Sequence, residues 1–134
     1  MRPSYVRGPD RPLIEKTIHQ AVRDTAQRFP DRQAVVSRHQ NRRLTWAELD
    51  FEAGRVARGL AGLGLETQNR VGVWASNCIE WLLLQIACSR ANLVLVNVNP
   101  AYRAHDLGYA EEIADAGSLP SRRRRACELS SDSR

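Results

Sequence analysis

Long apolar segments are missing from this chain of 134 residues. The apolar runs Leu82 to Leu84 and Leu93 to Val96 are far shorter than the ~20 residues that cross a bilayer. The amino-terminal segment MRPSYVRGPDRPL holds no apolar stretch of the signal-peptide type. We therefore expect a cytoplasmic protein without a membrane span, and a chain of this length suits one domain rather than two.

Cysteine and histidine are also scarce, which argues against a disulfide framework and a metal centre. Cys78, Cys88 and Cys127 are odd in number and match no ligand spacing such as C-x-x-C. A free cysteine behaves as a small buried hydrophobe, so we expect Cys78 and Cys88 to be packing thiols. The three histidines stand singly, without a second ligand at helical spacing: His19, His39 and His105. We assign no metal-binding residue.

Lysine is nearly absent, since Lys16 is the only lysine among 20 basic residues. The net charge of +5 and the run Arg122 to Arg125 raise the question of a nucleic-acid partner. However, residues 111–134 hold five basic and five acidic side chains, and the surplus of fifteen basic over ten acidic side chains is spread along residues 1–110. A dispersed surplus is typical of a solvated surface, so we expect no nucleic-acid binding.

The common reactive motifs are absent from the sequence. It contains no phosphate loop of the form G-x-x-x-x-G-K-S/T or G-x-G-x-x-G, no G-x-S-x-G elbow and no H-E-x-x-H. The glycines of GLAGLG, residues 59–64, follow a helical pattern and favour a helix terminus over a phosphate cradle. Ser76 and Asn77 would lie at the carboxyl end of a parallel strand, where ligands tend to bind, although helix capping is the simpler explanation. We assign no catalytic and no cofactor-binding residue.

The amino-terminal half predicts a helix followed by a hairpin. Apolar residues recur every three to four positions from Ile18 to Phe29, Thr17 is a suitable N-cap, and Phe29-Pro30 ends the run. Two short extended segments, residues 33–37 and 43–45, flank the polar stretch RHQNR and are typical of a β-hairpin.

The stretch from Thr45 predicts the strongest helix of the chain. Thr45 and Glu48 have the spacing of a capping box, in which the threonine oxygen accepts from the Glu48 backbone N–H and the carboxylate reaches back. An apolar stripe follows at spacings of three and four, and the glycines within residues 62–64 end the helix. The stripe consists of Trp46, Leu49, Ala53, Val56, Leu60 and Leu63.

The following segment predicts a βαβ unit, and with it an α/β fold class. Residues 70–76 and 93–100 form apolar strands, and residues 77–91 form a helix for which Asn77 is the expected N-cap. A connection of that length implies right-handed, parallel pairing. Because the strands show no alternation and the helix is apolar nearly all round, we expect each to be covered on both sides.

Four ordered groups of segments carry a resemblance: FPDRQAVV, LTWAEL, LAGLGL with RVGVWASNCIEW, and VNVNPAYRAHDLGY. They resemble the amino-terminal opening of the AMP-forming acyl-CoA synthetases of the adenylate-forming superfamily, and most closely the bacterial fatty-acyl-CoA synthetases for medium or long chains. The resemblance covers residues 17–109 and implies a partial N-terminal subdomain of that fold. It also implies the family reaction, in which a fatty acid, ATP and coenzyme A give acyl-CoA, AMP and pyrophosphate with Mg²⁺ present.

The family residues that bind ATP and carry out catalysis follow the matched segment, so none can be carried over. We therefore expect a truncated, inactive ligase fragment that binds none of the family cofactors, ATP, Mg²⁺ and coenzyme A. Residues 1–16 would form an extended arm, residues 17–110 a partial AMP-binding domain, and residues 111–134 an aberrant, mostly disordered tail. Two alternatives stay open: a small interaction module that binds a full-length paralogue and, with less support, a basic nucleic-acid binder.

Three departures from the family pattern carry further predictions. Gln68 and Asn69 stand where Gly-Asp is usual, and Asn92 stands where a glycine normally follows the helix. Asparagine tolerates the left-handed region, so the turn at Asn92 should survive. The third departure is the loss of similarity after Tyr109, which predicts that codons from about Ala110 onward are read in a shifted frame. The excess of arginine over lysine indicates GC-rich DNA, in which alternative frames stay open, whereas a natural variable tail is the rival explanation.

Overall fold

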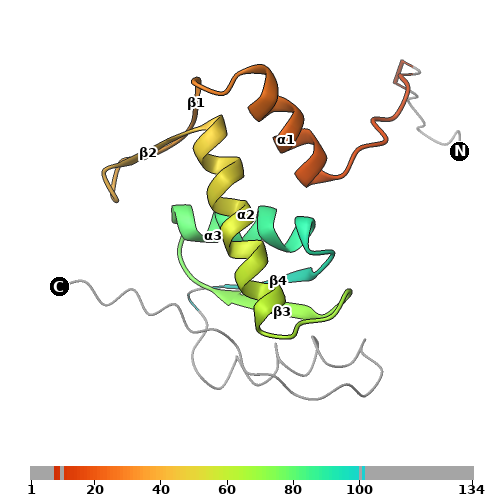
Figure 1. Cartoon of the computed structure of the whole chain (residues 1–134), viewed down its shortest axis with the longest axis vertical. Coiled ribbons are helices and arrows are strands. Elements are labelled where there is room, and N and C mark those ends of the chain that lie inside the picture. The colour runs from red at the N-terminus through yellow and green to blue at the C-terminus, as the bar shows by residue number, and fades with distance from the viewer. Residues whose placement is uncertain (1–7, 10, 100, 102–134) are drawn as a thin grey trace, which may run out of the picture.

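The computed structural model describes residues 8–9, 11–99 and 101, and these residues form an α/β fold (Figure 1). In chain order the elements are α1 (Ile18–Arg28), β1 (Gln33–Ser37), β2 (Arg42–Thr45), α2 (Trp46–Gly62), β3 (Arg70–Trp74), α3 (Ile79–Arg90) and β4 (Val94–Val98). The first pair of strands is antiparallel and the second is parallel. The predicted fold class, with its hairpin and parallel unit, is confirmed. The predicted tail of residues 111–134 and the first seven residues of the predicted arm lie outside the described residues.

Both helices of the amino-terminal half begin at capping boxes. The Thr17 hydroxyl accepts from the Gln20 N–H at 3.4 Å, and Gln20 Oε1 accepts from the Thr17 N–H at 2.9 Å. The Thr45 hydroxyl accepts from the Glu48 N–H at 3.2 Å, and Glu48 Oε2 accepts from the Thr45 N–H at 2.8 Å. Each box pairs backbone donors that the helix itself leaves without a partner. The predicted N-caps Thr17 and Thr45 are therefore confirmed.

The β1–β2 hairpin has the predicted place, with β2 beginning one residue earlier than expected, at Arg42. Val35 pairs with Leu44, and the register is irregular between Gln33 and Val35. Asn41 in the turn has φ 49°, and its N–H donates to the Arg38 carbonyl at 3.2 Å. Asparagine adopts this left-handed conformation more readily than most residues, which allows the tight return of the chain.

The parallel pair β3–β4 carries α2 and α3 on one side (Figure 1). Gly72 pairs with Val96, and Val71 pairs with Leu95. Because side chains alternate along a strand, the buried Val71 and Val73 share one face, and Gly72 and Trp74 share the other. Burial alternates along β3, and the described helices lie against one face of the pair, so the cover that the sequence leads us to expect on the second face is not supplied by the described residues.

The helix α3 begins later than the sequence predicts. Its N-cap position is Cys78 rather than Asn77, and the Cys78 side chain makes no capping hydrogen bond. Gln40 of the hairpin turn supplies the acceptor instead, with its Oε1 atom 2.9 Å from the Ile79 nitrogen. The prediction that Asn77 caps this helix was wrong because the acceptor comes from a residue 39 positions away in the sequence.

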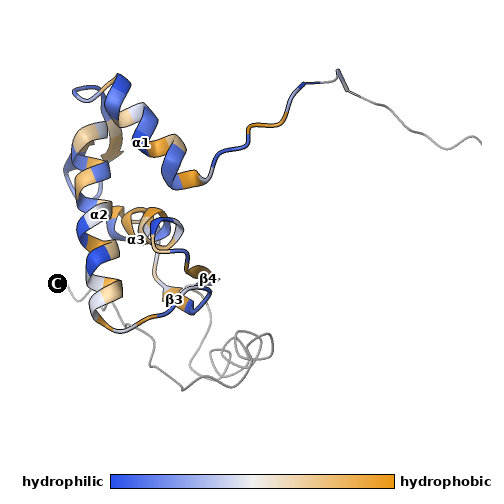
Figure 2. Ribbon diagram, turned by 45° about the vertical axis from the view of Figure 1, so that its right-hand side comes forward, coloured by the Kyte–Doolittle hydropathy of each residue, from blue (hydrophilic) through white to orange (hydrophobic). Residues whose placement is uncertain are grey.

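The core lies between the hairpin, α2 and α3. Figure 2 shows α3 to be apolar over most of its surface, whereas hydrophilic and hydrophobic residues alternate along α1 and α2. The buried cluster consists of Leu44, Leu49, Ala53, Ile79, Leu83 and Ile86. In the described part of the chain, no helix is both long and apolar enough to span a membrane.

The predicted apolar stripe of α2 holds over most of the helix and fails at its end. Leu49 and Ala53 belong to the buried cluster, and the partly buried Trp46 and Val56 pack against it. Leu63, in contrast, is 60% exposed. Leu63 is the C-cap, where helical spacing no longer fixes the direction of a side chain, so its inclusion in the stripe was wrong.

An ion pair joins α2 to the end of α3. Arg90 Nη2 donates to Asp50 Oδ1 at 2.7 Å, and Arg90 Nη1 donates to the Asp50 backbone carbonyl at 3.1 Å. Gly54, one turn further along α2, leaves space for the guanidinium group, since a Cβ atom there would lie 2.6 Å from Arg90 Nη1. The absence of a side chain at Gly54 therefore leaves room for the Arg90 guanidinium group beside α2.

Candidate functional site

The carboxyl edge of the parallel strands is the first place to look for a ligand site. Trp74 and Val98 pair at this edge, and the chain then continues through residues 75–78 into α3. Ser76 and Asn77, the two polar residues that the sequence places here, are both exposed. Neither is held against a titratable partner in the described part of the chain, so the edge presents no reactive constellation.

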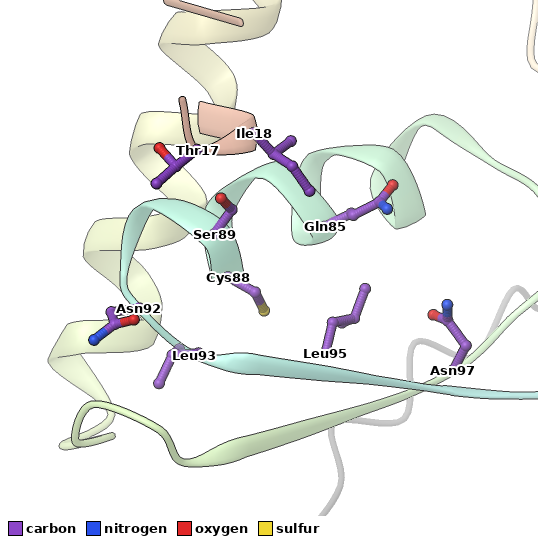
Figure 3. A pocket seen from close by; sticks show the side chains of 9 residues that line it. All are labelled: Thr17, Ile18, Gln85, Cys88, Ser89, Asn92, Leu93, Leu95 and Asn97. Carbon is purple, nitrogen blue, oxygen red and sulfur yellow. The ribbon is translucent and has the colours of Figure 1, made fainter. Parts of the chain in front are cut away.

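A groove of about 380 Å³ lies between the start of α1, the end of α3 and β4 (Figure 3). Its apolar side is formed by Ile18, Leu93 and Leu95, and its polar side chains are hydroxyls and amides such as Ser89 and Gln85. Figure 3 shows Gln85 and Asn97 above and beside the aliphatic Leu95. This lining is neutral, so it offers contacts to a neutral, partly aliphatic group but no charge for a phosphate.

Cys88 also lines the groove, but its chemistry is that of a packing residue. The side chain is 1% exposed, and burial raises the pKa of the thiol to about 11. The reactive thiolate is therefore suppressed near neutral pH. The prediction that Cys88 is a packing thiol is confirmed, Cys78 is half-buried at the start of α3, and Cys127 lies outside the described residues.

The histidines take part in local contacts. His19 Nδ1 lies 3.1 Å from the Thr17 hydroxyl, and His39 Nδ1 lies 3.3 Å from the Ser37 hydroxyl. His105 lies outside the described residues. Within residues 8–9, 11–99 and 101, no three His, Cys, Asp or Glu side chains gather as metal ligands would.

The glycine-rich stretch at residues 59–64 is the end of a helix, as predicted. Gly59 and Gly62 belong to α2, and Gly64 follows it with φ 72°. The Gly64 N–H donates to the Ala61 carbonyl at 3.0 Å, so the left-handed glycine closes the last turn.

One polar cluster escaped sequence reasoning, and it joins the hairpin turn to α3. Gln40 Nε2 donates to Glu80 Oε2 at 2.7 Å, and Arg42 Nη1 donates to Glu80 Oε1 at 2.7 Å. The hydrogen bond from Gln40 is the main cause that holds the pKa of Glu80 below its ordinary value, and the charge of Arg42 acts in the same direction. No local pattern reveals such a cluster, because Gln40 and Glu80 are 40 positions apart.

The sequence of this chain is similar to those of known enzymes. Residues 22–120 match the family model described as AMP-binding enzyme. The chain is 45% identical over 107 residues to the mitochondrial medium-chain acyl-CoA ligase ACSF2 of Rattus norvegicus, a match that covers 79% of this chain and 17% of the relative. It is 41% identical over 107 residues to the putative acyl-CoA synthetase YngI of Bacillus subtilis, covering 80% of this chain and 20% of the relative.

Solved structures give the same picture of the fold. The N-terminal domain of FACL13 from Mycobacterium tuberculosis superposes with a TM-score of 0.71 at 26% identity, covering 74% of this chain and 25% of that one. The N-terminal subdomain of NpsA from Klebsiella oxytoca, in complex with anthranilyl-AMSN, superposes with a TM-score of 0.69 at 24% identity, covering 74% and 26% of the two chains. The described architecture is therefore that of the N-terminal subdomain of adenylate-forming enzymes, of which this chain spans a minor part.

Proposed function

Because the chain belongs to the family of AMP-binding enzymes, we propose that it forms the opening segment of an AMP-forming ligase that joins fatty acids to coenzyme A. The observation that carries this proposal is the 45% identity over 107 residues to a medium-chain acyl-CoA ligase. The fold alone would not separate acid substrates, since the NpsA subdomain of similar fold is bound to an anthranilyl compound. Sequence identity at this level supports a fatty acid as the substrate of the whole protein.

The described residues do not by themselves fit ATP and Mg²⁺, the cofactors of the family. The groove beside α3 is lined by neutral side chains, and a triphosphate needs preorganised cationic or N–H donors. The described residues also hold no cluster of oxygen and nitrogen ligands for a cation. We therefore derive no catalytic step from these residues, and assign them the task of supporting a subdomain rather than carrying out its chemistry.

The polypeptide of 134 residues, taken by itself, should consequently fail to form acyl adenylate. The test is ATP–pyrophosphate exchange with octanoate and with palmitate as substrates. We expect no exchange above a blank prepared from cells without the chain. Exchange that follows the protein through purification would contradict this part of the proposal.

Segment replacement tests the ligase assignment itself. The matched 107 residues would replace their counterpart in the rat medium-chain ligase, and the segment of NpsA with the same fold would serve as the control replacement. We expect octanoate-dependent exchange in the first chimera within about tenfold of the parent and a far larger loss in the second. Equal loss in two folded chimeras would show that similarity of fold, rather than membership of the ligase group, accounts for the match.

The face of the β3–β4 sheet that no described helix covers favours a second candidate function, association with a full-length synthetase. Trp74 and Val94 lie on this face and are 38% and 39% exposed. A parallel sheet normally has both faces covered, so a complementary part of a related enzyme would find an apolar surface here. Co-sedimentation of the chain with the Bacillus subtilis relative tests this, and two independent boundaries would contradict it.

Compartment and nucleic-acid binding belong to the proposal as well. The sequence favours the cytoplasm, whereas the vertebrate relatives are named as mitochondrial proteins. A fluorescent fusion expressed in the source cell separates the two compartments.

The dispersed basic side chains support the absence of a nucleic-acid partner, and a binding assay at low and high salt checks it.

A further inference from the structure

The turn of the hairpin meets the first turn of α3 through one amide side chain. Gln40 Oε1 accepts from the Ile79 N–H at 2.9 Å and from the Ser37 hydroxyl at 2.9 Å. Gln40 Nε2 donates to Glu80 Oε2 at 2.7 Å. Both ends of the amide are therefore used, and the reversed amide would set its NH₂ group against the Ile79 N–H.

The start of α3 needs such an acceptor. The first four N–H groups of a helix have no partner within the helix, and a side chain at the N-cap usually accepts one of them. Cys78 occupies the N-cap position without making that hydrogen bond. Gln40 takes over the task from another element, and Ile79 is the first residue of the helix.

The surrounding contacts hold Gln40 in place for this task. Arg42 Nη1 donates to Glu80 Oε1 at 2.7 Å, so both carboxylate oxygens of Glu80 are bound by the hairpin. Leu44 of β2 and Ile79 of α3 belong to the same buried cluster. The hairpin and α3 are therefore joined by a shared apolar cluster as well as by the hydrogen bonds of Gln40 and Arg42.

We infer that Gln40 is a positioning residue, which caps α3 from the hairpin turn and thereby fixes the loop of residues 75–78 at the carboxyl edge of the parallel strands. The cap thereby ties the hairpin turn to the first turn of α3. In open parallel sheets, ligands are bound at this edge, so a residue of the hairpin sets the position of a potential binding loop that it does not itself belong to. This link stands whether or not the ligase assignment is correct, because it concerns the cap and not the substrate.

Hydrogen–deuterium exchange of the full chain tests the inference, with single amides separated by fragment mass spectrometry. The measured quantity is the protection of the Ile79 amide relative to that of Ile86, in the middle of α3. For Gln40→Ala we expect this ratio to fall about tenfold, as for loss of a helix cap. The control is Gln33→Ala, which removes an exposed amide from the same hairpin and should leave the ratio within about twofold.

A second variant separates capping from general support. The double variant Gln40→Glu with Glu80→Gln keeps an oxygen acceptor for the Ile79 N–H and lets the amide at position 80 donate to the carboxylate at position 40, so it should preserve the ratio. Overturning results are an unchanged ratio in Gln40→Ala, equal loss of protection at Ile79 and Ile86, or no protection of Ile79 in the unmodified chain. Should Gln40→Ala fail to fold, loss of the ratio in the double variant would overturn the inference and its retention would support it.

Discussion

Gln68 and Asn92, which are 24 positions apart in the sequence, are joined by two hydrogen bonds, and the backbone of both residues is in the left-handed conformation. The Gln68 N–H donates to the Asn92 carbonyl at 2.8 Å, and Gln68 Nε2 donates to Asn92 Oδ1 at 3.2 Å. Their φ angles are 66° and 55°. The resemblance described above implies glycine at both positions in the family, and the left-handed backbone at Gln68 and Asn92 gives a physical reason for it. The predicted turn at Asn92 is confirmed, and Gln68 adopts the same strained region with support from Asn92.

Replacement of Asn92 should reveal this backbone requirement. Asn92→Ala puts alanine, which tolerates the left-handed region less well than asparagine, at this position and removes the side-chain hydrogen bond to Gln68. It should lower the free energy of unfolding by about 1–2 kcal/mol. Asn92→Gly relieves the strain while losing the same bond, and should stay within about 0.5 kcal/mol of the original. Urea denaturation followed by tryptophan fluorescence measures both. Equal effects of the two substitutions would show that the hydrogen bond, and not φ, controls stability here.

Two glycines of α2 should respond differently to alanine. A methyl group added at Gly59 would meet open space, so Gly59→Ala should raise the free energy of unfolding by about 0.5–1 kcal/mol through helix propensity. A methyl group at Gly54 meets Arg90 Nη1 at 2.6 Å and displaces it from Asp50. The gain should therefore be cancelled or reversed in Gly54→Ala. A larger gain at Gly54 than at Gly59 in the same urea titration would contradict the assigned role of Arg90.

The lowered pKa of Glu80 predicts a specific dependence of stability on pH. A carboxyl group whose folded pKa lies below the unfolded value of 4.5 stabilises the fold above that pH, and this contribution is lost as pH falls through the folded pKa. In Glu80→Gln, the decline of the urea midpoint below about pH 5 should be shallower than in the original chain. The free energies of unfolding of the two chains should change with pH by amounts that differ by less than about 1 kcal/mol, because the Glu80 and Arg42 side chains are partly solvated. Glu52→Gln is the control for loss of one negative charge, and identical profiles for the original chain and Glu80→Gln would refute the prediction.

The apolar face of the β3–β4 sheet should drive self-association of the isolated chain. Val94→Glu places a charge on this face and should raise the concentration at which oligomers form by at least about tenfold. Val36→Glu is the matched control, since Val36 is 48% exposed but belongs to the hairpin. Analytical ultracentrifugation over a concentration series distinguishes them. Equal effects of the two substitutions, or a monodisperse original chain at every concentration, would count against this face as the contact.

The gene should show a one-base shift near codon 110. In the alternative frame we expect a basic turn followed by an apolar strand, and further on a Ser/Thr/Gly-rich phosphate loop. The family match extends to residue 120, so similarity to the family does not end at Tyr109 as predicted from the sequence, and the two frames have to be compared on both sides of codon 120. A stop within a few codons of the shift, or no phosphate-loop sequence downstream, would leave the natural variable tail as the explanation.

Local signals account for the elements that the sequence predicted well. The capping boxes at Thr17 and Thr45 lie within three residues of their partners, so the sequence contains both members of each pair. The parallel pairing of residues 70–74 with 94–98 followed from two apolar segments and the length of their connection. The polar cluster of Gln40, Arg42 and Glu80 could not be predicted from local patterns, because its hydrogen bonds join residues about 40 positions apart in the sequence.

The sequence by itself determined the helix starts at Ile18 and Trp46, the hairpin and the α/β class, because capping and periodicity act over a few residues. Only the tertiary structure decided where α3 begins. Asn77 carries the local capping signal, but the buried cluster that holds both Leu44 of the hairpin and Ile79 of α3 brings the Gln40 amide to the helix, and its Oε1 atom accepts from the first N–H. An unpaired N–H at the start of a helix can donate to any acceptor within reach. Tertiary packing, which acts between residues far apart in the sequence, decides which acceptor is close enough.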